Sequence, residues 1–381
     1  MRAILAGGSA FGENMKQIYR VLTLLTLMGS AAAADSGPFD FEFEEVANGV
    51  WVGVRPDSPK FPVMGNTTFV ISDKGVVVFD GGGMPVMAEK IIDKIRAITD
   101  QAVTHVVISH WHGDHNFGIY RFAEEFPNVQ FVAHSFTDRA MNGSPVDYIK
   151  NYAIFDEIRL PQYRTILETG KDADGNEVTE HDMQAYRQIV ADAAVLGPEF
   201  KRVRLTVPNV VFDDRLVIHS GSRTIELLSL GHGNTEGDIV MWLPEEELVA
   251  AGDLVVLPSP YAFNVPPKAW AATLRKLNGL NYKVLVPGHG AVQRDSSYVD
   301  LVIAVAEDIA KQRDAMIAEG VSTEDVESRL DFSAYEERFT GGDTYIKGYY
   351  DEWFVQPLRA AAMKELTGEP MKEIGPREAS E

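Results

Sequence analysis

The residues best suited to chemistry lie in one short run, His110-Trp111-His112-Gly113-Asp114-His115, which holds three imidazoles and one carboxylate. The run directly follows the apolar segment 105–109, which is typical of a β-strand, so we expect it to form a loop at a strand end. Ligands spaced this closely cannot all reach one point, but two can face one site and two a neighbouring site. Neutral imidazole and carboxylate suit Zn, Fe or Mn, and Gly113 lets the backbone turn tightly between the two pairs. The run therefore predicts a metal-binding loop.

This run resembles the H-x-H-x-D-H signature of the metallo-β-lactamase superfamily. Four further residues stand in the family's order, each at the end of an expected strand: Asp80, His232, Asp253 and His289. The resemblance covers roughly residues 46–292. It implies an α/β fold, the four-layer αββα metallo-β-lactamase sandwich, with two mixed sheets back to back and helices outside. It also places the metal site at one edge of the sandwich, where the strand ends converge.

Position by position, the resemblance implies a class B β-lactamase-like centre built only from His and Asp, which holds two Zn²⁺ ions, with Fe or Mn as alternatives. The expected ligands are His110, His112 and His232 for the first metal and Asp114, His115 and His289 for the second, with Asp253 bridging them. Asp80 is expected to orient the ligand loop without touching metal. Asp114 and Asp253 are the expected catalytic carboxylates of a mechanism in which two cations share a hydroxide and lower its pKa.

The reaction that suits such a centre is hydrolysis, in which a metal-bound hydroxide attacks an acyl bond of the β-lactam, lactone or thioester class. Asp253 stands where some class B β-lactamases carry a cysteine ligand, and His115 stands where the same subgroup has a non-ligand. Both departures resemble the glyoxalase-II-like and lactonase branches of the family. No lysine closely follows Asp253 to hold a β-lactam carboxylate.

Three other functions stay open from the sequence. Mononuclear iron enzymes of the persulfide-dioxygenase kind share this fold and much of the motif, and so do hydrolases of small phosphodiesters. A non-enzymatic module could use the metal only for folding or partner binding. Seven ligand-type residues around an open pair of metals exceed what a structural site needs, which argues against that module.

Aromatic residues near the expected centre could line a substrate pocket. Trp111 lies within the ligand loop, and Tyr261 and Phe263 lie in the Pro-rich segment 258–270. Lys268, in the same segment, is a candidate cation for an anionic substrate.

The composition limits the class of partner. The 381 residues include no cysteine, which excludes disulfides and thiolate metal sites. The formal net charge of −21 repels phosphate backbones. We therefore expect a small-molecule substrate and no nucleic-acid partner.

The predicted signal segment is 1–34, within which residues 15–34 have the pattern of a secretory signal peptide. Lys16 and Arg20 precede the apolar run 21–28, and the three alanines of 32–34 form a small-residue cleavage pattern. Residues 1–14 precede this pattern, so Met15 is a candidate natural start. No later apolar run reaches the roughly 20 residues that a membrane-spanning helix needs. We expect a periplasmic or secreted protein with no membrane segment after the signal is removed.

The elements that must position the metal ligands alternate between strands and helices. Short apolar runs bounded by turn residues predict strands at 50–54, 67–72, 76–80, 105–109, 131–133, 215–219, 223–229, 238–243, 247–252 and 283–287. Apolar residues at helical spacing predict a helix over 84–98, a helical insertion over 143–200 within the 46–292 domain, and a helical extension over 293–381. The apolar stripes after residue 295 can pack on the sandwich or form a homodimer contact.

Overall fold

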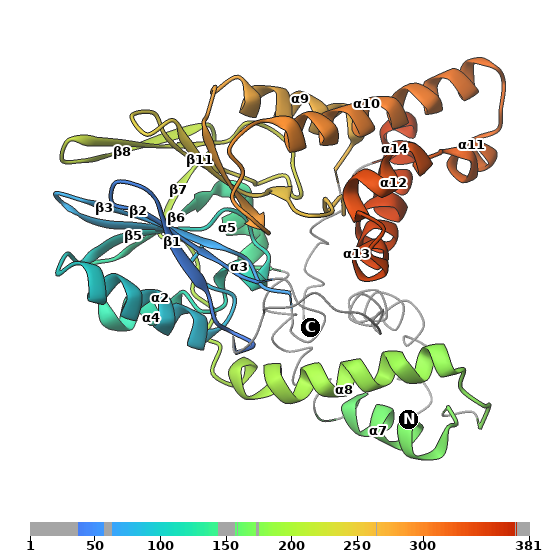
Figure 1. The fold of residues 1–381 in the computed structure, drawn as a ribbon, viewed down its shortest axis with the longest axis horizontal. Coiled ribbons are helices and arrows are strands. Elements are labelled where there is room, and N and C mark those ends of the chain that lie inside the picture. Colours follow the sequence, from blue (N-terminus) through green and yellow to red (C-terminus); the bar gives the residue numbers. More distant parts are fainter. Residues whose placement is uncertain are drawn as a thin grey trace, which may run out of the picture.

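Two mixed β-sheets lie face to face, and helices cover the outer face of each (Figure 1). The computed structural model describes residues 37–56, 63–143, 157, 159–172, 175–263, 265–369 and 371. The predicted signal peptide at 1–34 lies outside the described residues. The four-layer αββα architecture predicted from the sequence is confirmed, together with the helical insertion and the C-terminal helices.

The first sheet has seven strands, arranged in the order in which they occur along the chain. The first four pair antiparallel, and the others extend the sheet in parallel from the fourth. They are β1 (Glu42–Ala47), β2 (Val50–Val54), β3 (Thr67–Ser72), β4 (Gly75–Phe79), β5 (Val103–Val107), β6 (Gln130–His134) and β7 (Val210–Phe212). Apolar runs predict neither β1 nor β7, because β1 is rich in glutamate and β7 has only three residues.

The second sheet has five strands in the order β12-β11-β10-β9-β8. All neighbours pair antiparallel except β11 and β12, which are parallel. The strands are β8 (Arg215–Ser220), β9 (Arg223–Leu228), β10 (Val240–Leu243), β11 (Leu248–Val256) and β12 (Val284–His289).

Strand β4 shows why a continuous apolar run belongs at the centre of this fold. Val77 and Phe79 face the other sheet, where they pack in one core with residues such as Leu227 and Met241. Val76 and Val78 point to the opposite face and join the core under the outer helices. Successive side chains alternate between the faces of a strand, so a strand covered on both sides is apolar at every position.

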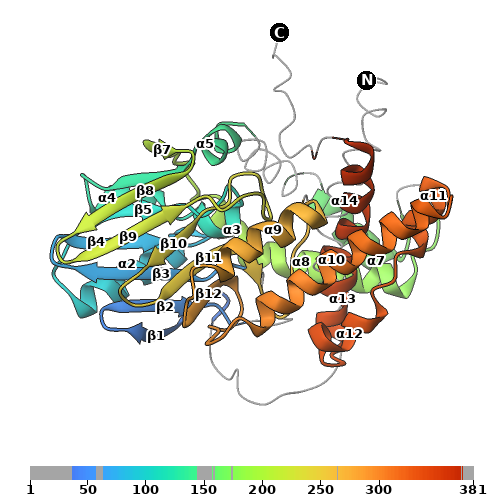
Figure 2. The same cartoon turned by 90° about the horizontal axis from the view of Figure 1, so that it is seen from above.

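The outer helices bury one apolar face each. On the first sheet lie α2 (Pro85–Ile98) and α4 (Tyr120–Glu125), with α3 (Gly113–Asn116) and α5 (Ser135–Met141) beside the strand ends. Met87, Ile91 and Ile95 recur at helical spacing in α2 and are fully buried. On the second sheet lie α9 (Pro267–Asn278) and α10 (Ser297–Ala318), which cross it side by side (Figure 2).

The C-terminal extension folds back onto α9 and α10. It comprises α11 (Thr323–Arg329), α12 (Ser333–Thr340), α13 (Thr344–Tyr349), the π-helix η2 (Tyr350–Val355) and α14 (Gln356–Thr367). Tyr350, Phe354 and Leu358 are fully buried in the same core as the outer face of the second sheet. Packing on the sandwich is therefore confirmed, whereas the homodimer contact stays a prediction.

The insertion forms a helical hairpin of α7 (Leu160–Thr169) and α8 (Glu180–Phe200), which projects beyond the sheets (Figure 1). Its attachment lies at the end of α8, where Leu196 packs with Met84 and Met87. Glu199 Oε2 also accepts a hydrogen bond from the backbone N–H of Val86 at 2.9 Å.

Among the described residues, no helix combines the length and the apolar character needed to cross a membrane.

A buried carboxyl group lies in this hairpin. Asp192 is 2% exposed, and its Oδ1 accepts a hydrogen bond from Gln188 Nε2 at 2.9 Å. Its Oδ2 is buried without a hydrogen-bond partner among the described residues. Burial raises the pKa of Asp192 to about 7, although the Gln188 hydrogen bond opposes the shift.

The raised pKa predicts that stability falls as the pH rises through this range. Between about pH 4 and pH 7 the unfolded chain has lost the Asp192 proton while the folded chain keeps it, and the full penalty remains above pH 7. Asp192→Asn should therefore raise the free energy of unfolding by about 2 kcal/mol at pH 8 and change it little at pH 4. Urea denaturation at both pH values measures this, with the exposed Asp100→Asn as the control. An equal effect of Asp192→Asn at the two pH values would contradict the prediction.

Candidate metal centre

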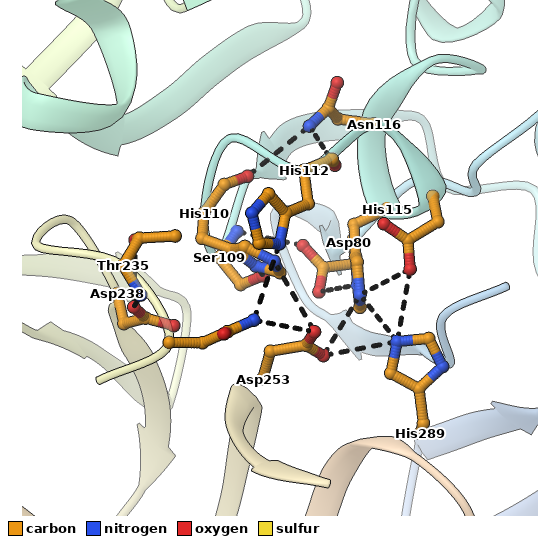
Figure 3. A network of polar contacts seen from close by, with 12 residues as sticks. Asp80, Ser109, His110, His112, His115, Asn116, Thr235, Asp238, Asp253 and His289 are labelled. Carbon is orange, nitrogen blue, oxygen red and sulfur yellow. Dashed lines mark hydrogen bonds and ion pairs between the residues drawn. The ribbon is translucent and has the colours of Figure 1, made fainter. Parts of the chain in front are cut away.

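Six of the predicted ligands, all except His232, come from segments of both sheets and lie close together (Figure 3). In the first sheet, Asp80 directly follows β4 and the run 110–115 follows β5. In the second sheet, Asp253 lies within β11 and His289 is the last residue of β12. Each of these strand pairs is parallel, so each delivers its C-terminal ends to the same edge.

One group of ligand atoms comes from His110, His112 and Asp253, and all three atoms lie within 4.8 Å of one another. His110 is fully buried, and Ser109 Oγ lies 2.8 Å from its Nδ1. That contact engages Nδ1 and leaves Nε2 toward Asp253, whose Oδ2 is 3.6 Å away. Imidazole nitrogen and carboxylate oxygen thus face one point.

A second group comes from Asp114, His115 and His289, whose ligand atoms also lie within 4.8 Å of one another. The Nε2 atoms of His115 and His289 are 3.2 Å apart. Asp114 Oδ2 lies 3.4 Å from His115 Nε2 and 3.2 Å from His289 Nε2. These three side chains come from α3 and β12, so the group joins the two sheets.

Asp253 lies between the two groups (Figure 3). Its Oδ2 faces His110, while its Oδ1 is 3.1 Å from His115 Nε2 and 3.4 Å from His289 Nε2. The pairing register of β11 with β12 shifts on both sides of Gly252. Such irregularities re-aim a side chain at the end of a ladder. One carboxylate therefore offers an oxygen to each group.

The second group fits a bound cation because its converging atoms are all acceptors. His115 Nδ1 donates to Asp80 Oδ2 at 2.9 Å, so Nε2 of the neutral ring carries a lone pair. Ligand atoms at about 2.0–2.1 Å from a tetrahedral zinc lie roughly 3.3–3.4 Å from one another. The contacts of His115 and His289 Nε2 with each other and with the two carboxylates span 3.1–3.4 Å, which matches that spacing. Without a cation or added protons these lone pairs would repel one another.

Burial and charge shift the pKa of His110, in the first group, and the pKa values of the two histidines of the second group in opposite directions. Burial lowers the pKa of His110 well below its usual value, and Asp253 offsets this only in part. Burial also disfavours charge on His115 and His289, but Asp253 and Asp114 outweigh it. The pKa of His115 lies well above its usual value, and that of His289 rises to about 9. Protons therefore occupy the second group when no metal does, and a metal that binds there must displace them.

The metallo-beta-lactamase superfamily model matches residues 61–289, a span that contains both ligand groups. The chain belongs to this superfamily. The linear primary-alkylsulfatase of Pseudomonas sp. (strain ATCC 19151) is 20% identical to it over 299 residues, which are 73% of this chain and 51% of the relative. The beta-lactamase-like protein 2 homolog of Caenorhabditis elegans is 21% identical over 234 residues, 61% of this chain and 58% of the relative. The chain thus spans about half the length of these curated relatives.

Solved structures of metallo-beta-lactamases also align with the chain. A metallo-beta-lactamase from Pontibacter korlensis aligns at a TM-score of 0.48 and 18% identity, over 70% of this chain and 99% of that one. DIM-1 metallo-beta-lactamase exposed to ceftazidime aligns at a TM-score of 0.47 and 16% identity, over 70% of this chain and 97% of that one.

Asp80 supports the ligand loop of this metallo-beta-lactamase fold through both of its oxygens. Oδ1 accepts the backbone N–H of Ser109 at 2.9 Å, and Oδ2 accepts His115 Nδ1–H at 2.9 Å. Its backbone has a φ of 62°, a left-handed conformation that Asp and Asn adopt more readily than other non-glycine residues. The geometry agrees with the predicted orienting role.

Asn66 and Asn116 hold the surrounding loops, and no motif in the sequence marks either of them. Asn66 Nδ2 donates to the carbonyls of Pro287 at 3.0 Å and Gly290 at 2.9 Å, which ties the first sheet to the end of β12. Asn116 Nδ2 donates to the carbonyl of His112 at 2.6 Å. Asn116 is the last residue of α3 and Asn66 directly precedes β3, and an asparagine at the end of a helix or strand is common in any sequence, so its partners become visible only in the folded chain.

Gly288 lets β12 pass directly beside the bridging carboxylate. A Cβ at Gly288 would lie 2.0 Å from Asp253 Oδ1 and 2.7 Å from the backbone carbon of Gly252. Neither atom can move far, because one belongs to the centre and the other to a strand. The close approach therefore requires glycine at this position.

His232 is the predicted ligand that belongs to neither of the two groups found among the described residues. It lies in the loop between β9 and β10, and Asn234 brings this loop to the centre. Asn234 Nδ2 is 3.3 Å from Asp253 Oδ2 and 3.4 Å from His112 Nδ1. Metal ligation by His232 stays a prediction.

The predicted pocket residues surround the ligand groups. The ring centroids of Trp111 and His112 are 4.5 Å apart, those of Tyr261 and His289 are 5.4 Å apart, and those of Phe263 and His112 are 6.4 Å apart. Lys268 instead forms an ion pair at 2.7 Å with Asp314 on α10. Because Lys268 is paired with Asp314, the structure gives no support to its predicted role as a cation that binds an anionic substrate.

Asp80→Asn should weaken metal binding while the fold persists. The amide keeps the side-chain shape and tolerates the left-handed backbone, but its NH₂ can oppose His115 Nδ1–H and favour the tautomer that places a proton on Nε2. We expect a roughly 10- to 100-fold loss of metal affinity, measured by competition with a chelating indicator. Asp100→Asn is the matched control, and unchanged affinity in Asp80→Asn would contradict the orienting role.

Gly288→Ala should displace Asp253 and weaken both ligand groups together, because this carboxylate lies between them. We expect the bound metal per chain to fall by more than half on dialysis, measured by inductively coupled plasma mass spectrometry. Gly320→Ala adds the same methyl group far from the centre, where no atom lies within 4 Å but the φ of 82° strains an alanine, and it therefore controls for a general loss of stability. Full metal content in Gly288→Ala would show that the strand can move away from the carboxylate.

Proposed function

We propose that this chain is an exported, zinc-dependent hydrolase that cleaves an acyl bond of a small molecule. The observation that carries this proposal is the position of Asp253, with one oxygen toward His110 and the other 3.1 Å from His115 Nε2. A carboxylate shared by two groups of acceptors suits two cations side by side. The signal-peptide pattern of residues 1–34 supports export to the periplasm or beyond the cell.

His110 and His112 would hold one metal, and Asp114, His115 and His289 would hold the other, with Asp253 shared; His232 is the predicted further ligand. The donor set of nitrogen and oxygen fits Zn²⁺ and also Fe or Mn. When bound, such a pair supplies a Lewis acid and a water acidic enough to attack near neutral pH.

Asp114 is the ligand-type carboxylate most accessible to substrate. Its side chain is 28% exposed, whereas those of His115 and Asp253 are 0% and 2% exposed. Burial opposes its charge, but His115 and His289 hold its pKa well below the usual range, so it stays ionised. An ionised, accessible carboxylate beside the metal ligands can accept a hydrogen bond from the attacking water and position that water toward the acyl carbon.

The chemistry and the relatives support a set of candidate substrates. β-Lactams, lactones and thioesters each present an electrophilic acyl carbon to a polarised water. The alkylsulfatase relative adds a sulfate ester to the candidates. Two separate ligand groups favour a dinuclear hydrolase over a mononuclear iron dioxygenase.

Metal analysis combined with a substrate panel tests the proposal. We expect about two divalent metals per chain and turnover of at least one of nitrocefin, a lactone and a thioester, measured beside a phosphodiester and dodecyl sulfate. Asp114→Asn should lower kcat/KM by more than about 100-fold, because the variant loses both a charged metal ligand and the carboxylate that positions the water. His219→Gln removes an exposed imidazole on β8 and should leave activity unchanged.

Several outcomes would overturn the proposal. One iron per chain with oxygen-dependent turnover would assign a dioxygenase. Turnover of the phosphodiester or the sulfate ester alone would move the reaction to another class of hydrolysis. Failure of every substrate in a zinc-replete protein with two metals would favour a non-enzymatic module.

A further inference from the structure

We propose that the C-terminal extension completes the substrate site, and that Trp353 forms with Tyr261 and Phe263 an aromatic wall that binds an apolar acyl group. This inference rests on the proposed acyl hydrolysis and names the kind of acyl group. The aromatic wall denotes these three residues below.

The aromatic wall is continuous with both ligand groups. Its two ends are Tyr261, whose ring centroid lies 5.4 Å from that of His289, and Phe263, at 6.4 Å from His112. Trp353 joins them, with ring centroids at 4.6 Å from Tyr261 and 5.6 Å from Phe263. A substrate held at the metal ligands therefore has an apolar surface directly beside it.

Part of the aromatic wall is open to solvent. Phe263 is 37% exposed, and the other exposed large hydrophobic side chains in the described part of the chain are Ile98 and Val211. Phe263 differs from them because its ring lies beside a predicted metal ligand. An apolar ring at the rim of a polar centre is a surface that a ligand can cover, and such coverage is favourable because it removes apolar surface from water.

The fold holds Trp353 in this position from two sides. In η2, Tyr350 and Phe354 are buried in the core formed with α9 and α10. The carbonyl of Trp353 accepts a hydrogen bond from the backbone N–H of Ala262 at 2.9 Å. A short π-helical segment such as η2 changes the helical register locally, and such segments are frequent at functional sites. The tryptophan is thus fixed against the loop that carries Tyr261 and Phe263.

The chemistry of the surroundings favours an uncharged group. The aromatic row continues from Trp353 to Tyr349, with ring centroids 4.7 Å apart, and on to Tyr345 at 4.9 Å. Lys268, from the same loop region, is engaged with Asp314. A straight apolar chain or an aromatic acyl group can lie along this row, whereas a charged group would lose its hydration against the aromatic rings.

Binding of fatty-acid anions tests the aromatic wall without requiring turnover. Titration calorimetry with the zinc-loaded protein should show that n-octanoate binds at least ten-fold more tightly than acetate. Trp353→Ala should weaken octanoate binding about ten-fold and leave acetate binding unchanged, and Trp353→Phe should retain most of the octanoate affinity. Tyr335→Ala, in α12 of the same extension, is the control because its hydroxyl contacts Ala304 of α10.

Kinetics on a chain-length series supplies a second readout. For p-nitrophenyl esters from acetate to octanoate, Trp353→Ala should raise KM for the octanoate ester about ten-fold more than KM for the acetate ester, whereas Tyr335→Ala should leave the ratio of the two KM values unchanged. If Trp353→Ala fails to fold, Phe263→Ala, which truncates an exposed loop side chain, should give the same loss of octanoate selectivity.

The outcomes separate this inference from the proposed function. Equal affinity for octanoate and acetate in the unmodified chain, or an equal loss of both in Trp353→Ala, overturns the aromatic wall. Selective octanoate binding that depends on Trp353, in a protein that hydrolyses nothing, supports the wall and overturns the hydrolase.

Discussion

The convergence of buried acceptor atoms around Asp253 is the constraint on which this structure depends. Imidazole nitrogens from His115 and His289 face each other and two carboxylates at 3.1–3.4 Å. Such an arrangement is unfavourable unless protons or cations lie between the lone pairs. The raised pKa values of His115 and His289 indicate that protons on these rings stabilise the arrangement when no metal is bound. The two sheets hold opposite halves of the centre, so a bound metal would also join them.

The supporting residues keep the two halves in register. Asp80 fixes the ligand loop of the first sheet, and Asn66 ties that sheet to the end of β12. Gly288 removes the side chain that would otherwise separate β12 from Asp253. Each acts through a buried hydrogen bond or a close backbone approach, and buried polar groups of this kind are costly to leave unpaired. The precision of the centre therefore lies in its surroundings as much as in its ligands.

The C-terminal extension has two faces with different roles. One face contributes Tyr350 and Phe354 to the core over the second sheet, which explains why the extension folds back. The other presents Trp353 to the loop at 261–263 beside the metal ligands. In our proposal, the metal centre supplies the chemistry common to the superfamily, and this extension selects the apolar part of the substrate.

The sequence by itself determined the ligand types and the buried strands, and its resemblance to the superfamily implied the layered fold. Continuous apolar runs such as 76–79 require a strand covered on both faces, and His and Asp at strand ends bring metal-binding atoms to one edge. Those signals are local, so they can be read along the chain. Only the tertiary structure decided that Asp253 faces both groups, that Asn66 and Gly288 bring β12 close, and that Trp353 reaches Tyr261. These contacts join segments far apart in the chain, and they depend on strand register and helix packing, which no local pattern encodes.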